Sequence, residues 1–390
     1  MILVDVLVVV VLLVALIAGV QRGFFASIGT LAGLAAGGFA AFWLTPLVSA
    51  WVPSQAWRAA AVLATAAGLL LLGAGIGAAI GSALRSGTDR LKLRGIERFL
   101  GGVASVVAAG LAIVLVAPAV AGIGIPGVST AISSSQAVRT LDWLTPDPVD
   151  TALAELRGHV IDEGIPRLGN LLGPGGTTPT APVELDDPDL QRAAASVARV
   201  SGTAFSCGRS ATGSGFVIAP DRVVTNAHVV AGVDTPIVEL PGAAAREGRI
   251  VYFDPVDDLA VIAVDDLGAA VIPQASTMTP GQSGAVHGYP LGGPFTSITA
   301  GILSVGTVPV ADIYDSGVTP REIYSLQAAV RPGNSGGPLL TADGAVAGVV
   351  FARADGDDGR GYAVTMAELA PVADAAPTLS ATVASGACID

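Results

Sequence analysis

The feature that most constrains this chain is a set of four apolar runs in its first third, at residues 2–20, 28–48, 59–84 and 99–120. The hydrocarbon core of a bilayer is about 30 Å thick, so a helix that rises 1.5 Å per residue crosses it in roughly 20 residues. Glycine and alanine recur in all four runs, as is usual where membrane helices pack closely. The pattern predicts an α-helical membrane domain with four spans at residues 1–122.

Two other interpretations of these runs fit less well. A cleaved secretion signal would begin with a basic segment and have a shorter apolar core, whereas run 2–20 has no basic leader and is followed by three more runs. Helices buried in a large soluble core are the second alternative, but apolar runs near 20 residues are typical of membrane spans. We therefore expect the first run to be retained as a span.

The basic residues of this region predict its orientation, because short cytoplasmic loops carry the excess of lysine and arginine. Arg22 follows the first run, and only Arg58 lies between the second and third runs. The connection between the third and fourth runs holds Arg85, Arg90, Lys92, Arg94 and Arg98. The two basic connections are thus expected in the cytoplasm, which places everything after Gly122 on the extracytoplasmic side of the cell membrane.

Charge divides the chain at the same place. Residues 1–122 hold 7 Lys and Arg against 3 Asp and Glu, whereas residues 123–390 hold 13 against 29. Binding to nucleic acid requires a basic surface that displaces counterions from phosphates, so the acidic second part argues against nucleic acid as a partner.

Residues 123–190 have the composition of an extracytoplasmic linker. Prolines recur from Pro126 to Pro182, and residues 173–179 read GPGGTTP. Proline has no amide donor, and glycine loses much backbone entropy when it is ordered. The second half of the linker is therefore expected to be flexible and solvated. Residues 149–165 carry apolar side chains at helical spacing and predict a short amphipathic helix, on which His159 is expected to be a surface residue without chemistry.

From Ala193 onward, short runs rich in β-branched residues alternate with Gly, Pro and Asp. These runs are residues 215–218, 222–224, 236–240, 249–252, 259–264, 285–287, 297–303, 324–328 and 346–351. Turn signals at this density are typical of an all-β barrel or sandwich. We expect one compact domain at residues 191–390.

Three segments of this domain carry the residue types of nucleophilic catalysis: 225–230 (TNAHVV), 257–261 (DDLAV) and 331–338 (RPGNSGGP). A serine hydroxyl is a weak nucleophile at neutral pH and needs a base whose pKa lies near the working pH, which histidine supplies. We expect His228 to take the proton of Ser335, and Asp258 to fix the imidazole tautomer. The glycines permit a tight turn in which the backbone amides of Gly333 and Ser335 form an oxyanion hole.

Each segment also has a purely structural interpretation. A core histidine, an acid that caps a strand and an ordinary glycine turn would explain the segments singly, but not all three in one domain. Asp257 competes with Asp258 as the orienting acid, and His287 is expected to be structural. The acidic run 355–359 (DGDDG) suggests calcium, but a calcium loop would need Glu at its twelfth position, which is Met366. We expect a solvated hairpin there and predict no metal site and no cofactor.

These motifs carry family resemblances. The His, Asp, Ser order makes the outer domain resemble the chymotrypsin-like serine peptidases, nearest the trypsin-like bacterial HtrA branch. The stretch 5–24, which ends GVQRGF, is similar to the small membrane proteins named for colicin V production. Joined by the linker, the two domains resemble the membrane-anchored periplasmic acid-resistance serine proteases of mycobacteria.

The resemblance implies a chymotrypsin-like double β-barrel with endopeptidase activity in the cell envelope, and a role in acid and oxidative stress. It favours Asp258 over Asp257, because the family acid directly precedes Leu-Ala-Val. It also implies that Ala329, Val350 and Phe351 line the substrate (S1) pocket. Since no acid stands among them, a modest apolar P1 residue is expected.

The two cysteines of the chain, Cys207 and Cys388, both lie in the outer domain. Thiols oxidise outside the cytoplasm, so an even pair predicts a disulfide, with two free buried thiols as the alternative. Closing a loop of about 180 residues would stabilise the domain by on the order of 5 kcal/mol in the loop-closure model.

The expected function is therefore a membrane-anchored extracytoplasmic serine endopeptidase, with protein or peptide substrates and the lipid bilayer as partners. The alternative from another class is a catalytically inactive protease-fold scaffold on a transporter-like membrane domain. Intact His228, Asp258 and Ser335 count against it, because an inactive relic has no chemical reason to keep all three. An esterase with the same triad is the alternative among enzymes, and no oligomeric state is predicted.

Overall fold

The structure is a computed structural model that describes residues 2–51, 55–88, 94–122, 127–146, 148–149, 153, 165–169, 172, 181–204 and 209–389. The chain divides into two compact units, Ile2–Ile113 and Val114–Asp390. The first unit is helical and the second contains two β-sheets.

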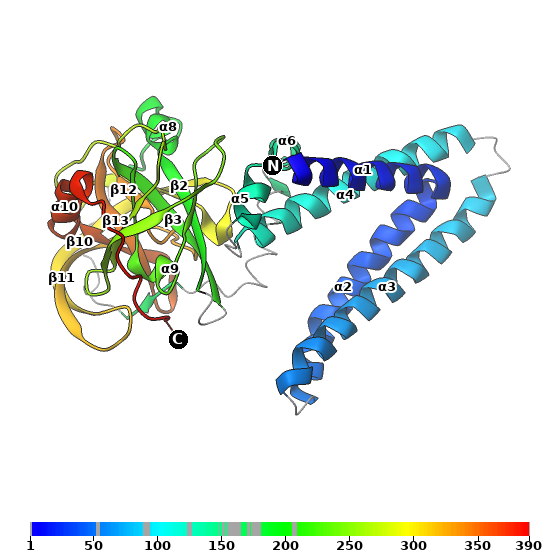
Figure 1. The fold of residues 1–390 in the computed structure, drawn as a ribbon, viewed down its shortest axis with the longest axis horizontal. Coiled ribbons are helices and arrows are strands. Elements are labelled where there is room, and N and C mark those ends of the chain that lie inside the picture. Colours follow the sequence, from blue (N-terminus) through cyan, green and yellow to red (C-terminus); the bar gives the residue numbers. More distant parts are fainter. Residues whose placement is uncertain are drawn as a thin grey trace. The chain divides into compact units, whose positions relative to one another are not determined.

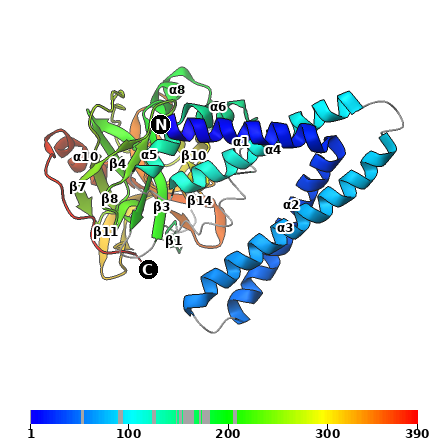
Figure 2. The same cartoon turned by 45° about the vertical axis from the view of Figure 1, so that its right-hand side comes forward.

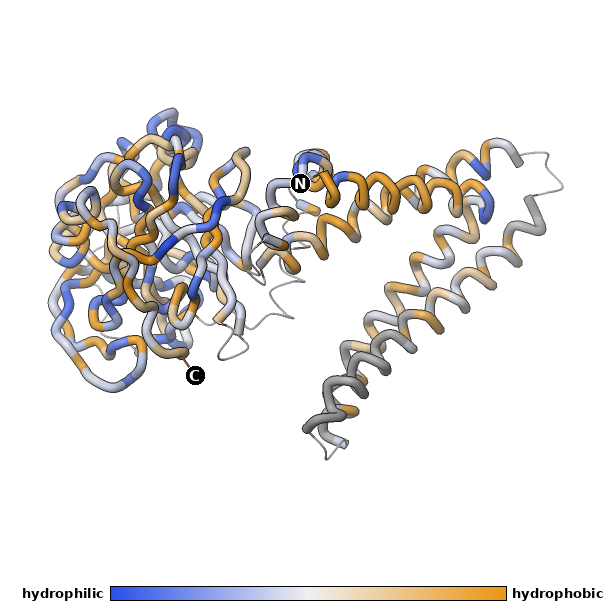
Figure 3. Tube along the Cα trace, in the orientation of Figure 1, coloured by the Kyte–Doolittle hydropathy of each residue, from blue (hydrophilic) through white to orange (hydrophobic). Residues whose placement is uncertain are grey.

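Long apolar helices make up the first unit: α1 (Ile2–Arg22), α2 (Phe24–Trp51), α3 (Gln55–Thr88) and α4 (Arg94–Gly122), whose last residues, from Val114, belong to the second unit. Three stretches are long and apolar enough to cross a membrane, namely Ile2–Arg22, Phe24–Ala41 and Gly95–Pro118. Figure 3 shows α1 as hydrophobic along nearly its whole length. The third predicted span falls on α3, whose described apolar stretch Leu71–Leu84 is shorter. Within the described residues, the prediction of four spans is confirmed for three.

Glycines explain how α2 and α3 lie side by side, as Figures 1 and 2 both show. Gly33 faces Gly73, and Gly29 faces Gly77. A Cβ atom at any of these positions would overlap the backbone of the facing helix, so only glycine allows this close approach. Gly23 has another role: its φ of 83° ends α1 and lets α2 begin at the next residue, where the sequence predicted a longer connection.

The second unit contains two seven-stranded sheets (Figure 1). The first sheet has the order β6-β5-β2-β3-β4-β8-β7, and the second has the order β1-β13-β12-β9-β10-β11-β14. A further pairing of β13 with β14 closes the second sheet on itself. Each of the nine runs predicted as strands overlaps a strand of the structure.

The strands of the first sheet are β2 (Val197–Ala204), β3 (Arg209–Ala219), β4 (Arg222–Thr225), β5 (Ile237–Glu239), β6 (Arg246–Glu247), β7 (Arg249–Asp254) and β8 (Leu259–Ala263). Those of the second sheet are β1 (Arg167–Leu168), β9 (Ser283–Gly288), β10 (Thr296–Ala311), β11 (Val318–Gln327), β12 (Pro338–Leu340), β13 (Val346–Ala354) and β14 (Asp357–Thr365). Short helices complete the unit: α5 (Val128–Ser133), α6 (Gln136–Leu144), α8 (Pro188–Ala194), α9 (Ala227–Val230), η2 (Pro290–Gly292), α10 (Met366–Ala375) and η3 (Ala376–Thr378).

Apolar side chains hold the two sheets together. One cluster of buried residues takes Phe216 and Leu259 from the first sheet, Val349 and Tyr362 from the second, and Leu369 from α10. All five side chains are at most 2% exposed. Because this core is shared, the loops at the junction of the two sheets have fixed relative positions, and the predicted site residues lie on those loops.

Parts of the predicted linker pack on this unit. The guanidinium of Arg139 on α6 donates to the carbonyl of Gly242 at 3.1 Å, and the amide of Gly127 donates to Glu247 Oε1 at 3.1 Å. Strand β1 joins the second sheet. The helix predicted over residues 149–165 lies mostly outside the described residues, and His159 lies wholly outside them.

Candidate active site

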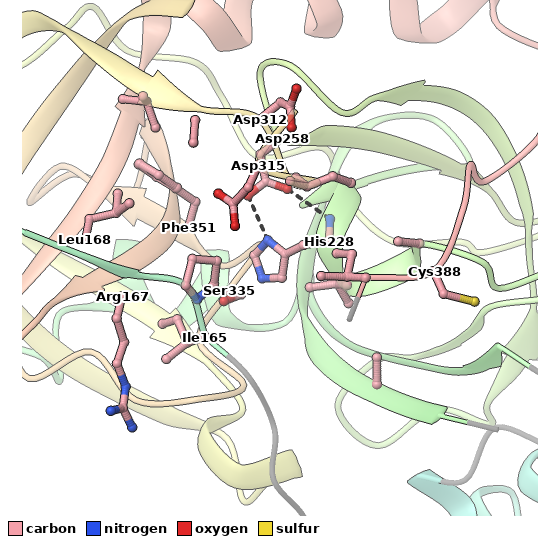
Figure 4. A pocket seen from close by; sticks show the side chains of 18 of the residues that line it. Ile165, Arg167, Leu168, His228, Asp258, Asp312, Asp315, Ser335, Phe351 and Cys388 are labelled. Atoms are coloured by element: carbon pink, nitrogen blue, oxygen red, sulfur yellow. Dashed lines mark hydrogen bonds and ion pairs between the residues drawn. The ribbon is translucent and has the colours of Figure 1, made fainter. Parts of the chain in front are cut away.

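A cavity of about 360 Å³ is lined by residues of all three predicted motifs (Figure 4). His228 belongs to α9, which follows β4, while Asp258 immediately precedes β8. Antiparallel pairing of β4 with β8 sets Thr225 opposite Ala260, so the residues just beyond these strand ends meet at one end of the first sheet. Ser335 comes from the second sheet, in the turn before β12.

Both carboxylate oxygens of Asp258 are bonded to His228. Oδ2 lies 2.7 Å from the ring Nδ1, and Oδ1 accepts the backbone N–H of His228 at 2.9 Å. The backbone carbonyl of Asp258 accepts from Asn226 Nδ2 at 2.7 Å. Asp258 is 2% exposed and has a φ of 56°, the left-handed region that aspartate tolerates better than most residues. A ring Nδ1–H that donates to this carboxylate leaves Nε2 as an acceptor.

Asp257, the competing acid, has no bond to His228. Its pKa is raised, first by burial and then by the nearby carboxylates of Asp254 and Glu368. The structure therefore pairs the histidine with Asp258.

Ser335 lies on the side of the imidazole opposite Asp258, as Figure 4 shows. It is 2% exposed, and its Oγ has no hydrogen-bond partner within the described residues. Leaving a buried hydroxyl unpaired is unfavourable by about 1–3 kcal/mol, so such groups are rare outside functional sites. The arrangement leaves the hydroxyl free to give its proton to the neighbouring base.

The backbone next to Ser335 is held in an orientation that suits an oxyanion hole. The carbonyl of Pro332 accepts from the amide of Leu291 at 2.7 Å, and the carbonyl of Gly333 accepts from Ser214 Oγ at 2.7 Å. In a trans peptide the N–H points opposite to the C=O, so the amide of Gly333 points away from Leu291. In the described part of the chain, neither this amide nor that of Ser335 donates to another protein group. Both amides are available to bind an anion.

Two glycines make this turn possible. Gly333 has a φ of 91° and Gly336 a φ of 82°. A Cβ on Gly333 would overlap the backbone of Tyr289 and Leu291, and one on Gly336 would overlap the carbonyl of Ser214. The glycines that the sequence placed in a tight turn are therefore required both by φ and by space.

The predicted S1 residues occupy different places. Phe351 lines the cavity, but neither Ala329 nor Val350 does. Val350 is fully buried in the second-sheet core, and Ala329 is exposed. The reason is local: Ala328 and Val330 point into the core, which turns the alanine between them outward.

A linker segment lies along the cavity, which the sequence did not predict. Ile165 and Leu168 line it on the Ser335 side (Figure 4). Strand β1 pairs in parallel with β13: the amide of Arg353 donates to the carbonyl of Pro166 at 3.1 Å, and the amide of Asp355 donates to that of Leu168 at 2.9 Å. The spacing of apolar residues could not predict this strand, because two residues are too few to show a periodic pattern.

His287 lies outside the cavity lining, in β9. It is 1% exposed, its ring packs edge-to-face on Phe295 at 5.3 Å, and neither ring nitrogen has a hydrogen-bond partner within the described residues. Burial lowers the pKa of His287 to about 4, so the ring is neutral at pH 7. This placement agrees with the structural role predicted for it.

The remaining predicted sites can be placed only in part. Cys388 lines the cavity, but Cys207 lies outside the described residues, so the disulfide stays a prediction. In the acidic run 355–359, residues 355 and 356 form the turn between β13 and β14, and the other three begin β14. Across the ranges that the structure describes, no three His, Cys, Asp or Glu side chains converge as a metal site would require.

Comparisons with known proteins point the same way as the geometry. Residues 213–349 match the trypsin-like peptidase domain family, and residues 4–146 match the colicin V production protein family. The chain is 32% identical to serine protease Rv3671c of Mycobacterium tuberculosis, over 99% of this chain and 98% of that protein. It is 34% identical to a "Probable periplasmic serine endoprotease DegP-like" of Halomonas elongata, over 43% of this chain and 35% of that protein. The crystal structure of the Rv3671c protease in its active form is similar, with a TM-score of 0.52 and 33% identity, over 58% of this chain and 99% of that chain.

Proposed function

The chain belongs to the family of serine proteases that includes Rv3671c of Mycobacterium tuberculosis, and we propose that it cleaves envelope proteins through an acyl-enzyme on Ser335. As a member with apolar N-terminal helices, it is a membrane-anchored serine protease. The observation that carries the proposed mechanism is the 2.7 Å bond from His228 Nδ1 to Asp258 Oδ2, in the cavity that holds Ser335.

Acylation would begin with attack of Ser335 Oγ on the scissile carbonyl while His228 Nε2 takes the hydroxyl proton. The tetrahedral intermediate places negative charge on the carbonyl oxygen, where the amides of Gly333 and Ser335 can donate to it. Imidazolium forms in this step, and the carboxylate of Asp258 stabilises it. His228 then protonates the leaving amine, and the peptide bond breaks.

Deacylation would use the same groups in reverse order. Water takes the place of the amine, His228 accepts its proton, and the oxyanion returns to the two amides. Ser335 recovers its proton as the carboxylic acid product leaves. Apart from water and the substrate, the groups that take part in these steps all belong to the chain.

Placement outside the cytoplasm is part of the proposal. The basic connections flanking the spans support it, as does the relative described as periplasmic. The proposed divisions are a membrane domain at 1–122, a linker at 123–190 and a double β-barrel protease domain at 191–390. The two sheets joined by a shared core support the last of these.

Two finer features of the proposal rest on the sequence. A Cys207–Cys388 disulfide would tie the C-terminal segment, where Cys388 lines the cavity, to the first sheet. A role in acid and oxidative stress is supported by the resemblance of the whole architecture to the acid-resistance proteases.

Proteolysis by the full-length protein in detergent tests the proposal. We expect hydrolysis of an unfolded protein substrate, its loss in Ser335→Ala, and normal activity in Ser380→Ala, which changes an exposed serine outside the cavity. Ester hydrolysis without cleavage of any protein would favour an esterase. Equal activity in Ser335→Ala and the wild type would contradict the proposed nucleophile.

A further inference from the structure

Arg321 is a buried cation in the wall of the catalytic cavity. It lies on β11, is 1% exposed, and lines the same cavity as His228 and Ser335. One terminal nitrogen, Nη2, donates to the carbonyl of Ala311 at 2.6 Å, but Nε and Nη1 have no hydrogen-bond partner within the described residues. A buried charge with unused donors is unfavourable for stability by itself, which suggests that the charge serves the site.

The guanidinium is held in one place. Its Cζ lies 5.4 Å from the centre of the Phe351 ring, within the range of a cation–π contact. With the Ala311 bond, this contact fixes the group from two sides. The position of the positive charge is therefore set by the second sheet.

The charge faces an acidic loop of the first sheet. Burial lowers the pKa of Arg321, against the raising effect of the carboxylates of Asp258, Asp257 and Asp254 in this loop and of Glu368 on α10. All four lie in the described part of the chain, and none forms a direct ion pair with Arg321, so the attraction acts through space. Where β10 turns into β11, the amide of Ile313 donates to the carbonyl of Pro255 at 3.1 Å, which ties this wall to the acidic loop.

We propose that Arg321 is a positioning residue for the reaction: its fixed positive charge attracts the carboxylate of Asp258 and helps to hold it in place against His228. This inference rests on the proposed function. Without the cation, the buried carboxylate of Asp258 and the half-buried ones near it would repel one another with no positive charge between them. A displaced Asp258 carboxylate could no longer stabilise the imidazolium that each step of the reaction creates.

The positive charge of Arg321 also acts on the neighbouring acid Asp257. The pKa of Asp257 is raised by burial, Asp254 and Glu368, and lowered by Arg321. The charged or titratable groups around Arg321 are Asp254, Asp257, Asp258 and Glu368, with His228, Arg167, Asp312 and Asp315 also in the cavity wall. Arg321 is the cation that counters these acids on the Asp258 side.

The test is the pH profile of kcat/KM for the full-length protein in detergent. Arg321→Met keeps an unbranched apolar side chain and removes the charge, whereas Arg321→Lys keeps the charge. We expect Met to lower kcat/KM at pH 7 by about 10- to 100-fold and to move the acid limb upward by at least about half a pH unit. Lys should restore the position of the acid limb, and the control Arg249→Met, on a half-exposed arginine outside the cavity, should match the wild type.

A structural role would give another pattern. If Met and Lys both lower kcat/KM with the acid limb unmoved, Arg321 only packs against Phe351 and the inference is wrong. If the Met variant fails to fold, Asp257→Asn and Glu368→Gln provide the opposite test, since they remove neighbouring negative charge. The inference then requires the acid limb to move to lower pH, and an unchanged limb would contradict it. An inactive wild type would instead overturn the proposed function.

Discussion

The two sheets contribute different kinds of group to the catalytic cavity. The first sheet provides side chains already fixed by hydrogen bonds, with Asp258 bonded to both the ring and the backbone of His228. The second sheet provides groups that have no hydrogen-bond partner among the described residues: the Ser335 hydroxyl, the amide of Gly333 and two nitrogens of Arg321. In the proposed mechanism, the pair that moves the proton is therefore organised in advance, while the hydroxyl and the amide that would meet substrate stay without partners until it arrives.

The largest effect is expected from Asp258→Asn, which disrupts the hydrogen-bonded pair of Asp258 and His228 in the first sheet. An amide at this position can donate to Nδ1 and select the wrong imidazole tautomer, so kcat/KM should fall by about 10⁴-fold with the fold intact. Steady-state hydrolysis of a peptide substrate measures it. The matched variant Asp257→Asn should lose less than about tenfold at pH 7, because that acid has no bond to His228. Equal losses in the two variants would contradict the assignment.

The variant Gly336→Ala tests the contact between the two sheets. The new Cβ would overlap the carbonyl of Ser214 in the first sheet at a φ of 82°, so the free energy of unfolding should fall by about 3 kcal/mol or more. Pulse proteolysis in urea measures the stability of the β unit. Gly356→Ala is the control: it has a similar φ of 73° but open space around its Cβ, so it should lose only about 1 kcal/mol. A Gly336→Ala variant as stable as Gly356→Ala would argue against a tight junction.

The histidines sharpen the contrast, since His228 is paired with a carboxylate and His287 is buried without a partner. Burial lowers the pKa of His287 to about 4 from its usual 6.5, so the unfolded state binds the proton first as pH falls. The stabilisation is complete above pH 6.5 and is lost toward pH 4. Between pH 7 and pH 5, the free energy of unfolding should fall by about 2 kcal/mol more in the wild type than in His287→Gln. Parallel pH dependences would show that His287 does not titrate in this way.

The smallest effect concerns the linker segment along the second sheet. Ile165 is 6% exposed and lines the cavity, so Ile165→Asp should release β1 from β13. Extended substrates would gain access to the amides of Arg353 and Asp355, and turnover of a protein substrate should rise by about threefold. Val318→Asp, at a 66% exposed position of the same sheet, is the control. Unchanged or lower turnover would show that the segment does not limit access.

The sequence predicted His228 and Asp258, the hydrogen-bonded pair of the first sheet, because the patterns that indicate them are local. His228 and Asp258 each lie next to a β-branched run that forms a strand. The glycines around Ser335 likewise indicate a turn. The strand positions followed from the same runs, although their lengths did not: β10 extends over 16 residues where seven were expected.

The parts that were not predicted depend on tertiary contacts. Arg321 is a single arginine in a strand, and only the fold brings it into the same cavity wall as Asp258. Strand β1 is stabilised by bonds to Arg353 and Asp355, nearly 190 residues away in the sequence. The family resemblance implied that Ala329 lines the S1 pocket, but its side chain is exposed between the buried Ala328 and Val330.

The central claim is that Ser335 is a nucleophile activated by His228 and Asp258. The most direct measurement is labelling of the folded full-length protein with a fluorophosphonate, followed by mass spectrometry of its peptides. The account predicts one adduct, on Ser335, that is lost in His228→Ala and strongly reduced in Asp258→Asn. No adduct in folded protein, an adduct at another serine, or labelling of Ser335 that persists in His228→Ala would contradict it.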